Sequence, residues 1–186
     1  FSATTGRAAK EIFVCDYAGR NPRAVTRNGR LSDEAEWSPG GRRLLYTRYT
    51  QSTTDVVEYD LGSGQSRRLV AFPGLNAGAA MSPSGNHLAL ILSKDRRVDL
   101  YLKAVNSAAM QRLTNDEAAE ASPCWSPSGD RICFVSGAFG NPRLFVVPAG
   151  GGAKIRLPTQ GVEAVSPSWS CDNIIAGASR SRRIRR

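Results

Sequence analysis

Short stretches in which apolar and polar residues alternate recur along the whole chain, and turns rich in Gly, Pro and Ser separate them. Examples are RRLLYTRY (42–49), DVVEYDL (55–61) and SRRLVAF (66–72), and the small apolar segment NAGAAM (76–81) follows them. A period of two residues is typical of β-strands. No window combines sustained helical periodicity with helix caps. The pattern therefore predicts an all-β protein of short strands joined by tight turns.

One short motif returns at a fixed spacing. Its four copies read WSPGG, MSPSG, WSPSG and WSCDN, lie 44 residues apart, and begin at Trp37, Met81, Trp125 and Trp169. The segments RAVT, RRLV, QRLT and IRLP keep the same step and phase. Four antiparallel strands in a repeat of this length are typical of a β-propeller blade. We therefore predict a β-propeller of four-stranded antiparallel blades with about four repeats, which is a partial or small propeller.

The motif itself has a structural interpretation. Pro fixes φ at the first central position of a turn and Gly supplies the positive φ that ends it, so Ser-Pro-x-Gly is a tight reversal between two strands. The Trp before it is large enough to fill the gap between neighbouring blades, and Met81 can fill the same position. The motif is expected to be structural rather than catalytic.

Composition and charge narrow the function classes. The chain has 186 residues and a formal net charge of +9, but its last eight residues, SRSRRIRR, hold five Arg and no acidic residue. Aromatic and basic residues do not interleave elsewhere, so we expect no nucleic-acid partner. No apolar run approaches the length of about 20 residues that a membrane span needs. We expect residues 1–178 to form the propeller and 179–186 to be a disordered basic tail.

Cysteine and histidine usage argues against a metal centre or other cofactor. Four Cys without a C-x-x-C pair and a single His87 do not form a metal-ligand pattern. Cys124 and Cys133 flank a predicted turn and should lie opposite each other on neighbouring strands. A disulfide there is conceivable, but the equivalent Ala80 and Ala89 favour a pair of buried free thiols. His87 follows a turn and is expected to be exposed.

Four segments resemble the propeller of the TolB family. They are VCDYAGRNPRAVT, EAEWSPGGRRLLYTR, LVAFPGLNAGAAMSPSGNHLALILSKDRRVDLYLK and RLTNDEAAEASPCWSPSGDRICFVSG, and the resemblance covers about residues 10 to 170. It implies a periplasmic, non-enzymatic binding protein of the Tol-Pal system, with the lipoprotein Pal as partner at the mouth of the propeller. It also implies a six-bladed ring.

The resemblance further implies which residues contact the partner. The family's contacts correspond to Leu75, Asn76 and Gly78 and, one blade on, to Ala121 and Ser122. Asn76 agrees with the family pattern, whereas Leu75 stands where His is typical and Ala121 where a hydroxyl residue is typical. More broadly, we expect the partner surface on the loops before the inner strands: residues 32–34, 75–78, 119–122 and 163–166.

The phase of the repeats does not decide whether the ring is closed. Three complete repeats run from Trp37. The C-terminal end of the chain then holds the first half of a further repeat, and the N-terminal end holds the second half of a repeat. These two halves add up to a fourth blade. The chain is therefore a closed four-bladed ring, an open arc of a larger propeller, or an assembly of complementary copies. Because the family's blades are shaped for a six-fold ring, we favour the open arc. Its free edges would allow self-association.

A second function class also fits a propeller of this kind. Such domains occur in peptidases and polysaccharide-degrading enzymes, where they control the access of substrate to chemistry located elsewhere. The Gly-x-Ser-x-Gly motif of a hydrolase is absent from the sequence. The segment AGGGAK (149–154) lacks the spacing of a phosphate-binding loop. The chain itself is therefore expected not to be an enzyme.

Overall fold

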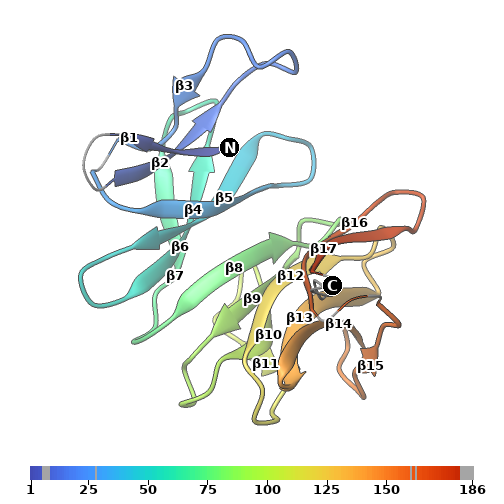
Figure 1. Cartoon of the computed structure of the whole chain (residues 1–186). Coiled ribbons are helices and arrows are strands. Elements are labelled where there is room, and N and C mark those ends of the chain that lie inside the picture. The colour runs from blue at the N-terminus through green and yellow to red at the C-terminus, as the bar shows by residue number, and fades with distance from the viewer. Residues whose placement is uncertain (6–8, 28, 160, 162, 181–186) are drawn as a thin grey trace, which may run out of the picture.

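The protein is an arc of antiparallel β-sheets. The computed structural model describes residues 1–5, 9–27, 29–159, 161 and 163–180. In these residues the regular secondary structure consists of 17 strands in five sheets, with no helix. The sheets follow one another in chain order along a curved row (Figure 1). The all-β propeller predicted from the repeats is confirmed, and we number the sheets blade 1 to blade 5.

Three blades contain four strands each, joined in meander order. Blade 2 consists of β4 (Ser32–Trp37), β5 (Arg43–Tyr49), β6 (Thr54–Asp60) and β7 (Ser66–Val70). Blade 3 consists of β8 (Asn76–Met81), β9 (His87–Leu92), β10 (Asp99–Ala104) and β11 (Met110–Arg112). Blade 4 consists of β12 (Glu120–Trp125), β13 (Arg131–Phe139), β14 (Asn141–Pro148) and β15 (Ile155–Arg156). The strands expected from the alternating segments lie within one or two residues of these bounds.

The two outer blades are shorter. Blade 1 contains β1 (Ser2–Thr5), β2 (Ala9–Val14) and β3 (Arg23–Ala24), and blade 5 contains β16 (Glu163–Trp169) and β17 (Ile175–Arg180). Within the described residues β1 and β17 belong to different sheets, so their outer edges do not pair and the arc is open. The tail predicted from residue 179 begins inside β17, so residues 179 and 180 are strand rather than tail; residues 181–186 lie outside the described residues.

The Ser-Pro-x-Gly turn forms as expected. In blade 4 the Gly129 N–H donates to the Ser126 carbonyl oxygen at 2.9 Å, and Gly129 has a φ of 75°. The Ser126 Oγ accepts the N–H of Arg131 at 3.0 Å, which closes the turn from its side chain. In the divergent fourth copy Asn173 takes the left-handed conformation at φ 64° and the turn survives. The motif serine is therefore a turn residue.

The hydrophobic core is divided into clusters that lie between neighbouring blades. Trp125 is 9% exposed and packs between blades 3 and 4, against Ala80, Ile91 and Phe134 among others. Its Nε1–H donates to the Ala80 carbonyl oxygen at 3.0 Å. The wedge predicted for the motif Trp is confirmed at this position.

The same prediction is wrong for Trp37, which is 51% exposed. Trp125 packs against β8, the inner strand of the preceding blade. Blade 1, which precedes Trp37, has no strand inside β1 among the described residues. The Trp37 ring therefore has no neighbouring inner strand to cover it.

The predicted cysteine pair occurs as free thiols. Cys124 and Cys133 are directly opposed on β12 and β13, with Cys133 buried and Cys124 half-buried. The contact with Cys133, together with burial, raises the pKa of the Cys124 thiol, so this thiol stays protonated and unreactive near neutral pH. His87 is exposed, as expected.

Candidate partner-binding site

The inner strands of blades 2 to 5 form the wall of one large cavity. The strands β4, β8, β12 and β16 lie side by side in this order. Together with the turns that follow them they enclose a cavity of about 610 Å³ on the axis of the arc. Two other pockets on the surface are smaller, at about 350 and 290 Å³. A concave surface lined by several elements is the usual place for a binding site.

Each inner strand is interrupted by a β-bulge at the same point of the repeat. One residue at each bulge takes the left-handed conformation, with φ between 48° and 56°: Glu34, Gly78, Ser122 and Ser166. Three of these residues are not glycine, and a side chain in this conformation is strained. Bulges of this kind redirect backbone groups, and here they do so at the cavity wall.

A carboxylate joins the bulges of blades 2 and 3. The Gly78 N–H donates to Glu34 Oε2 at 3.0 Å, and the Thr47 Oγ1–H donates to the same oxygen at 2.7 Å. Glu34 comes from β4 and Gly78 from β8, so this contact crosses the boundary between two blades. A carboxylate is a strong acceptor for a backbone N–H.

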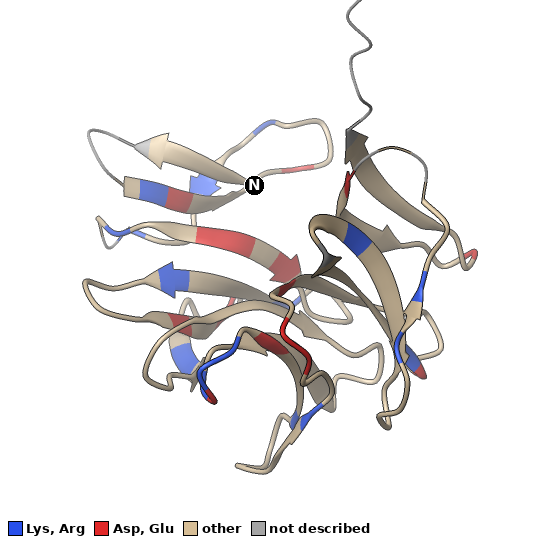
Figure 2. Ribbon diagram, turned by 60° about the horizontal axis from the view of Figure 1, so that its bottom comes forward, with Lys and Arg blue, Asp and Glu red and all other residues tan. Residues whose placement is uncertain are grey.

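The cavity has a one-sided charge distribution. Strand β4 carries the acidic residues, which Figure 2 shows on one ribbon near the middle of the molecule. Glu34 and Glu36 line the cavity, whereas its lining residues from β8, β12 and β16 and their turns are uncharged. Desolvation raises the pKa of Glu36 above its ordinary value. Three of the four inner strands therefore offer a surface without negative charge.

The structure places Leu75 and Asn76 at the start of β8. Leu75 is half-buried and packs against the cluster between blades 3 and 4. Asn76 is completely buried. Its Nδ2 donates to the carbonyl oxygens of Thr54 and Phe72, each at 2.7 Å, and its Oδ1 accepts the Phe72 N–H at 2.9 Å. The Asn76 side chain thus positions the chain that enters β8.

The other three predicted residues lie at or beside the bulges. Gly78 is half-buried, and a Cβ atom there would lie 3.3 Å from Pro123 Cδ of the next blade. Ala121 is exposed and pairs with Val135, and Ser122 is half-buried at the cavity wall. The structure therefore brings Gly78 and Ser122 together on the cavity wall, with Ala121 exposed directly before the Ser122 bulge.

The predicted partner segments are not all loops. Residue 32 begins β4, residue 76 begins β8, residue 120 begins β12 and residue 163 begins β16. The segments therefore lie mostly in the first halves of the inner strands, up to the bulges. The reason is the bulge itself, since it bends the chain and allows pairing to continue on both sides.

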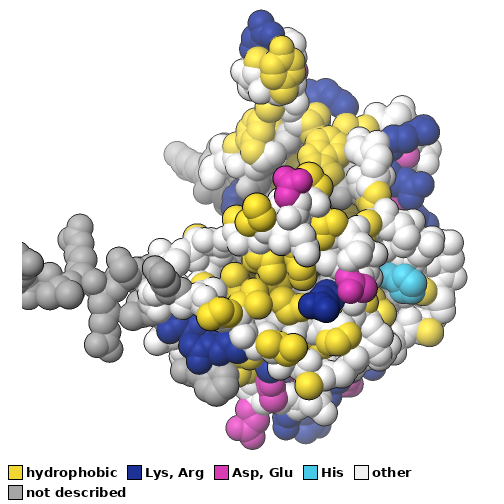
Figure 3. All heavy atoms as spheres, turned by 90° about the vertical axis from the view of Figure 1, so that its right-hand side faces the viewer, with side chains coloured by type: hydrophobic (Ala, Val, Ile, Leu, Met, Phe, Trp, Pro, Cys, Tyr) yellow, Lys and Arg dark blue, Asp and Glu magenta, His cyan; other side chains and the backbone are white. Residues whose placement is uncertain are grey.

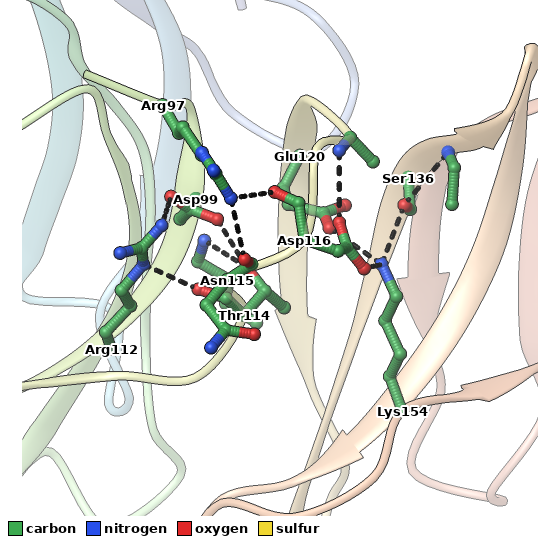
Figure 4. Close-up of polar contacts among 12 residues, drawn as sticks. Arg97, Asp99, Arg112, Thr114, Asn115, Asp116, Glu120, Ser136 and Lys154 are labelled. Atoms are coloured by element: carbon green, nitrogen blue, oxygen red, sulfur yellow. Dashed lines mark hydrogen bonds and ion pairs between the residues drawn. The ribbon is translucent and has the colours of Figure 1, made fainter. Parts of the chain in front are cut away.

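A partly buried ion cluster anchors the segment before Ser122 (Figure 4). Lys154 comes from the connection between β14 and β15, and its Nζ lies 2.5 Å from Asp116 Oδ2, 2.9 Å from Glu120 Oε1 and 3.1 Å from Ser136 Oγ. The same ammonium lies 4.8 Å from the centre of the Phe145 ring. The cluster ties the entry to β12 to the outer strands of its own blade.

The pKa values in this cluster follow from burial and pairing. Burial raises the pKa of Glu120, and the hydrogen bond from Lys154 opposes this only in part. Burial alone would lower the pKa of Lys154, but its bonds to Asp116 and Glu120 outweigh this effect and raise it. The ammonium is thus held in its charged form between two acidic groups.

Two features of the site were not predicted from the sequence. The Glu34–Gly78 contact could have been found, because both residues occupy the same phase of the 44-residue repeat as Ser122 and Ser166. The role of Lys154 had no such signal, since the residue in the same phase of blade 3 is Met110.

Neither a metal cluster nor a membrane span is found. Among the described residues, no group of three or more His, Cys, Asp and Glu side chains could hold a metal ion. The same residues contain no helix long and apolar enough to cross a membrane.

Comparison with known proteins agrees with this architecture. Residues 2–184 match the family described as TolB beta propeller domain. The chain belongs to this family. The Tol-Pal system protein TolB of Actinobacillus succinogenes is 38% identical over 66 residues, which is 36% of this chain and 16% of that protein. The chain thus matches only a small part of the length of this curated relative.

Solved structures show the same fold. The crystal structure of TolB from Acinetobacter baumannii has a TM-score of 0.86 at 22% identity, and the match covers 94% of this chain and 44% of that one. A puromycin-hydrolyzing peptidase of Mycobacterium tuberculosis has a TM-score of 0.66 at 16% identity, covering 95% of this chain and 34% of the peptidase. At these identities the structures establish the fold alone.

Proposed function

We propose that the chain is a non-enzymatic, protein-binding propeller of the bacterial cell envelope that works in the periplasm and binds a lipoprotein of the Pal type. The observation that carries the proposal is the TolB family match over residues 2–184, together with the Tol-Pal name of the curated relative. The cavity between the inner strands supplies a concave surface for a partner.

The proposed contact surface follows the predicted residues, with their roles divided. Ala121, Ser122, Gly78 and Leu75 would contact the partner, because each retains some exposure, and Gly78 and Ser122 also line the cavity. Asn76 would act indirectly by holding the entry to β8 in place, since its side chain is buried and bonded within the chain. Four of the five predicted residues would thus contact the partner, and Asn76 would position the chain that carries them in blade 3.

The substitution Ala121→Arg is expected to weaken capture of purified Pal at least tenfold, since a long charged side chain would stand at the centre of the proposed surface. The measurement is a pull-down, or calorimetry, with Pal from the same organism. Ala109→Arg is the matched control, because Ala109 is exposed in the connection between β10 and β11, outside that surface. Absence of Pal binding by the unsubstituted chain at high micromolar concentration would refute the Pal proposal.

The enzyme-module alternative rests on the fold shared with the peptidase. A propeller that controls access to an active site needs a hydrolase domain in the same reading frame. Finding such a domain in the gene would favour the alternative, and a neighbouring gene for a Pal-like lipoprotein would favour the binding protein.

The outer edges of the arc support a second proposed contact, between copies of this chain. Strands β1 and β17 each present an edge that is unpaired within the described residues. Trp37 is exposed at the end of β4, and Figure 3 shows hydrophobic side chains gathered on the side where blade 5 lies in Figure 1. Open edges with exposed apolar groups favour association.

We therefore expect the mass measured by light scattering to rise above 20.0 kDa as the protein concentration increases. The expected reason is strand pairing at the edges, which adds main-chain hydrogen bonds between copies. A constant monomer mass up to millimolar concentration would contradict this expectation.

A further inference from the structure

The Glu34 carboxylate occupies one of a series of equivalent backbone positions. It accepts the N–H of Gly78, the left-handed residue at the bulge of β8. Ser122 and Ser166 occupy the same position in β12 and β16, and both line the cavity. The contact in blade 3 therefore shows to which kind of acceptor such an N–H donates.

The pairing of β12 with β13 indicates where the Ser122 N–H points. The Gly137 N–H donates to the Ala119 carbonyl oxygen, and Ala121 pairs with Val135 in the same register. In an antiparallel pair every second residue bonds to the partner strand. Residues 119 and 121 therefore bond toward β13, and the N–H of Ser122 faces the other way, toward the cavity. The N–H of Gly78 follows the same rule in blade 3.

No carboxylate equivalent to Glu34 lies beside the N–H groups of Ser122 and Ser166 in the part of the chain that the structure describes. In the part of the chain that the structure describes, no side chain accepts a hydrogen bond from the N–H of Ser122 or of Ser166. The position that Glu34 holds in blade 2 is taken by Gly78 in blade 3, before Ser122, and by Ser122 in blade 4, before Ser166, and neither residue carries a carboxylate. The lining residues contributed by β8, β12 and β16 carry no negative charge, and the two carboxylates of the cavity, Glu34 and Glu36, both come from β4.

We propose that the backbone N–H groups of Ser122 and Ser166 bind the carboxylate side chains of Asp or Glu residues in an acidic segment of the partner protein. The inference rests on the proposed partner-binding function and names the chemistry of the partner. A carboxylate forms a stronger hydrogen bond with an N–H than a neutral acceptor does.

The test is a titration of the full chain, labelled with ¹⁵N, with the blocked peptide acetyl-Gly-Asp-Gly-amide. The amide signals of Ser122 and Ser166 should move in a saturable way, with a dissociation constant on the order of millimolar. Acetyl-Gly-Asn-Gly-amide, which is neutral, should produce about a tenfold weaker response. Equal responses to both peptides, or no movement at these two amides, would overturn the inference.

A third peptide separates the two sources of a carboxylate. Acetyl-Gly-Gly-Gly with a free carboxyl terminus carries its charge on the main chain rather than on a side chain. If only this peptide moves the two amides, binding of acidic side chains is refuted.

The variant Glu34→Gly provides an internal positive control. Glycine tolerates the φ of 55° found at this position, so the bulge should persist. Removal of the carboxylate leaves the Gly78 N–H with its longer contact to Thr47 Oγ1, at 3.3 Å, and the Gly78 amide should then respond to the aspartate peptide, whereas it should not in the unsubstituted chain. A Gly78 amide that stays silent in the variant would count against the inference.

The outcomes also separate this inference from the proposed function. Peptide responses at Ser122 and Ser166 without capture of Pal would retain the carboxylate site and refute Pal as the partner. Capture of Pal without a response to the aspartate peptide would refute the carboxylate site alone.

Discussion

Replacement of Trp125 by alanine should lower the free energy of unfolding by about 3–5 kcal/mol, the range for removing a large aromatic side chain from a core. The Trp125 ring fills the space between blades 3 and 4, so its loss leaves a cavity that two separate sheets line. The Ala80 carbonyl oxygen also loses its hydrogen bond from Nε1. Urea denaturation followed by circular dichroism measures the change.

The chain contains a matched control for this substitution. Trp37 occupies the same position of the repeat but is 51% exposed. Trp37→Ala should therefore cost less, about 1–2 kcal/mol, since about half of the side chain is already exposed to solvent. Equal losses for the two variants would mean that the motif Trp stabilises its own turn rather than the contact between blades.

The repeat could be predicted from the sequence because its signals are local. A turn such as that ending at Gly129 needs particular residues at particular positions, and the strands beside it need alternation. The fourth copy shows the limit of this rule. It lacks Pro and Gly, but the turn forms because Asn173 adopts the left-handed conformation that Gly usually supplies.

The environment of each copy could not be predicted in the same way. Trp37 and Trp125 have the same local sequence pattern, and only the presence of an inner strand in the preceding blade distinguishes them. Burial across blades depends on residues 40 or more positions away, such as Ala80 for Trp125.

The candidate site was predictable in position but not in detail. Alignment of the repeats locates Gly78 and Ser122 at one point of the blade. The bulge could not be predicted, because Glu34 and Ser166 are not residues that favour positive φ. The burial of Asn76 was also not evident, since its polar side chain is satisfied by main-chain groups on either side of β8.

Lys154→Met is expected to destabilise the chain by about 3–5 kcal/mol, because it removes one partner of a buried ion pair and leaves the other charged. The Glu120 side chain is completely buried, and its Oε2 has no hydrogen-bond partner among the described residues. The Lys154 ammonium is therefore the main group that compensates its charge. Chemical denaturation at pH 7 measures the loss.

The double variant Lys154→Met, Glu120→Gln separates charge from packing. If the uncompensated carboxylate causes the loss, the neutral amide should recover a large part of the stability. Recovery of none would assign the loss to the contact between the lysine stem and the Phe145 ring instead.

Acid should also reduce the effect of Lys154→Met. Burial raises the pKa of Glu120 in the folded state, so between its unfolded and folded pKa values the folded state binds more protons, and stability falls as pH rises through this window. Removing Lys154 raises this pKa further and widens the window. Asp116, whose pKa is lowered despite its burial because Lys154 bonds to it, contributes stability that is lost as pH falls, and the variant no longer has that contribution to lose. Between pH 7 and pH 5 the Glu120 effect acts, so the difference in stability between the variant and the unsubstituted chain should shrink over this range. The Asp116 effect acts in the same direction but only at lower pH, near and below the ordinary pKa of 3.8. A difference that stays constant would show that the cluster is not held by charge.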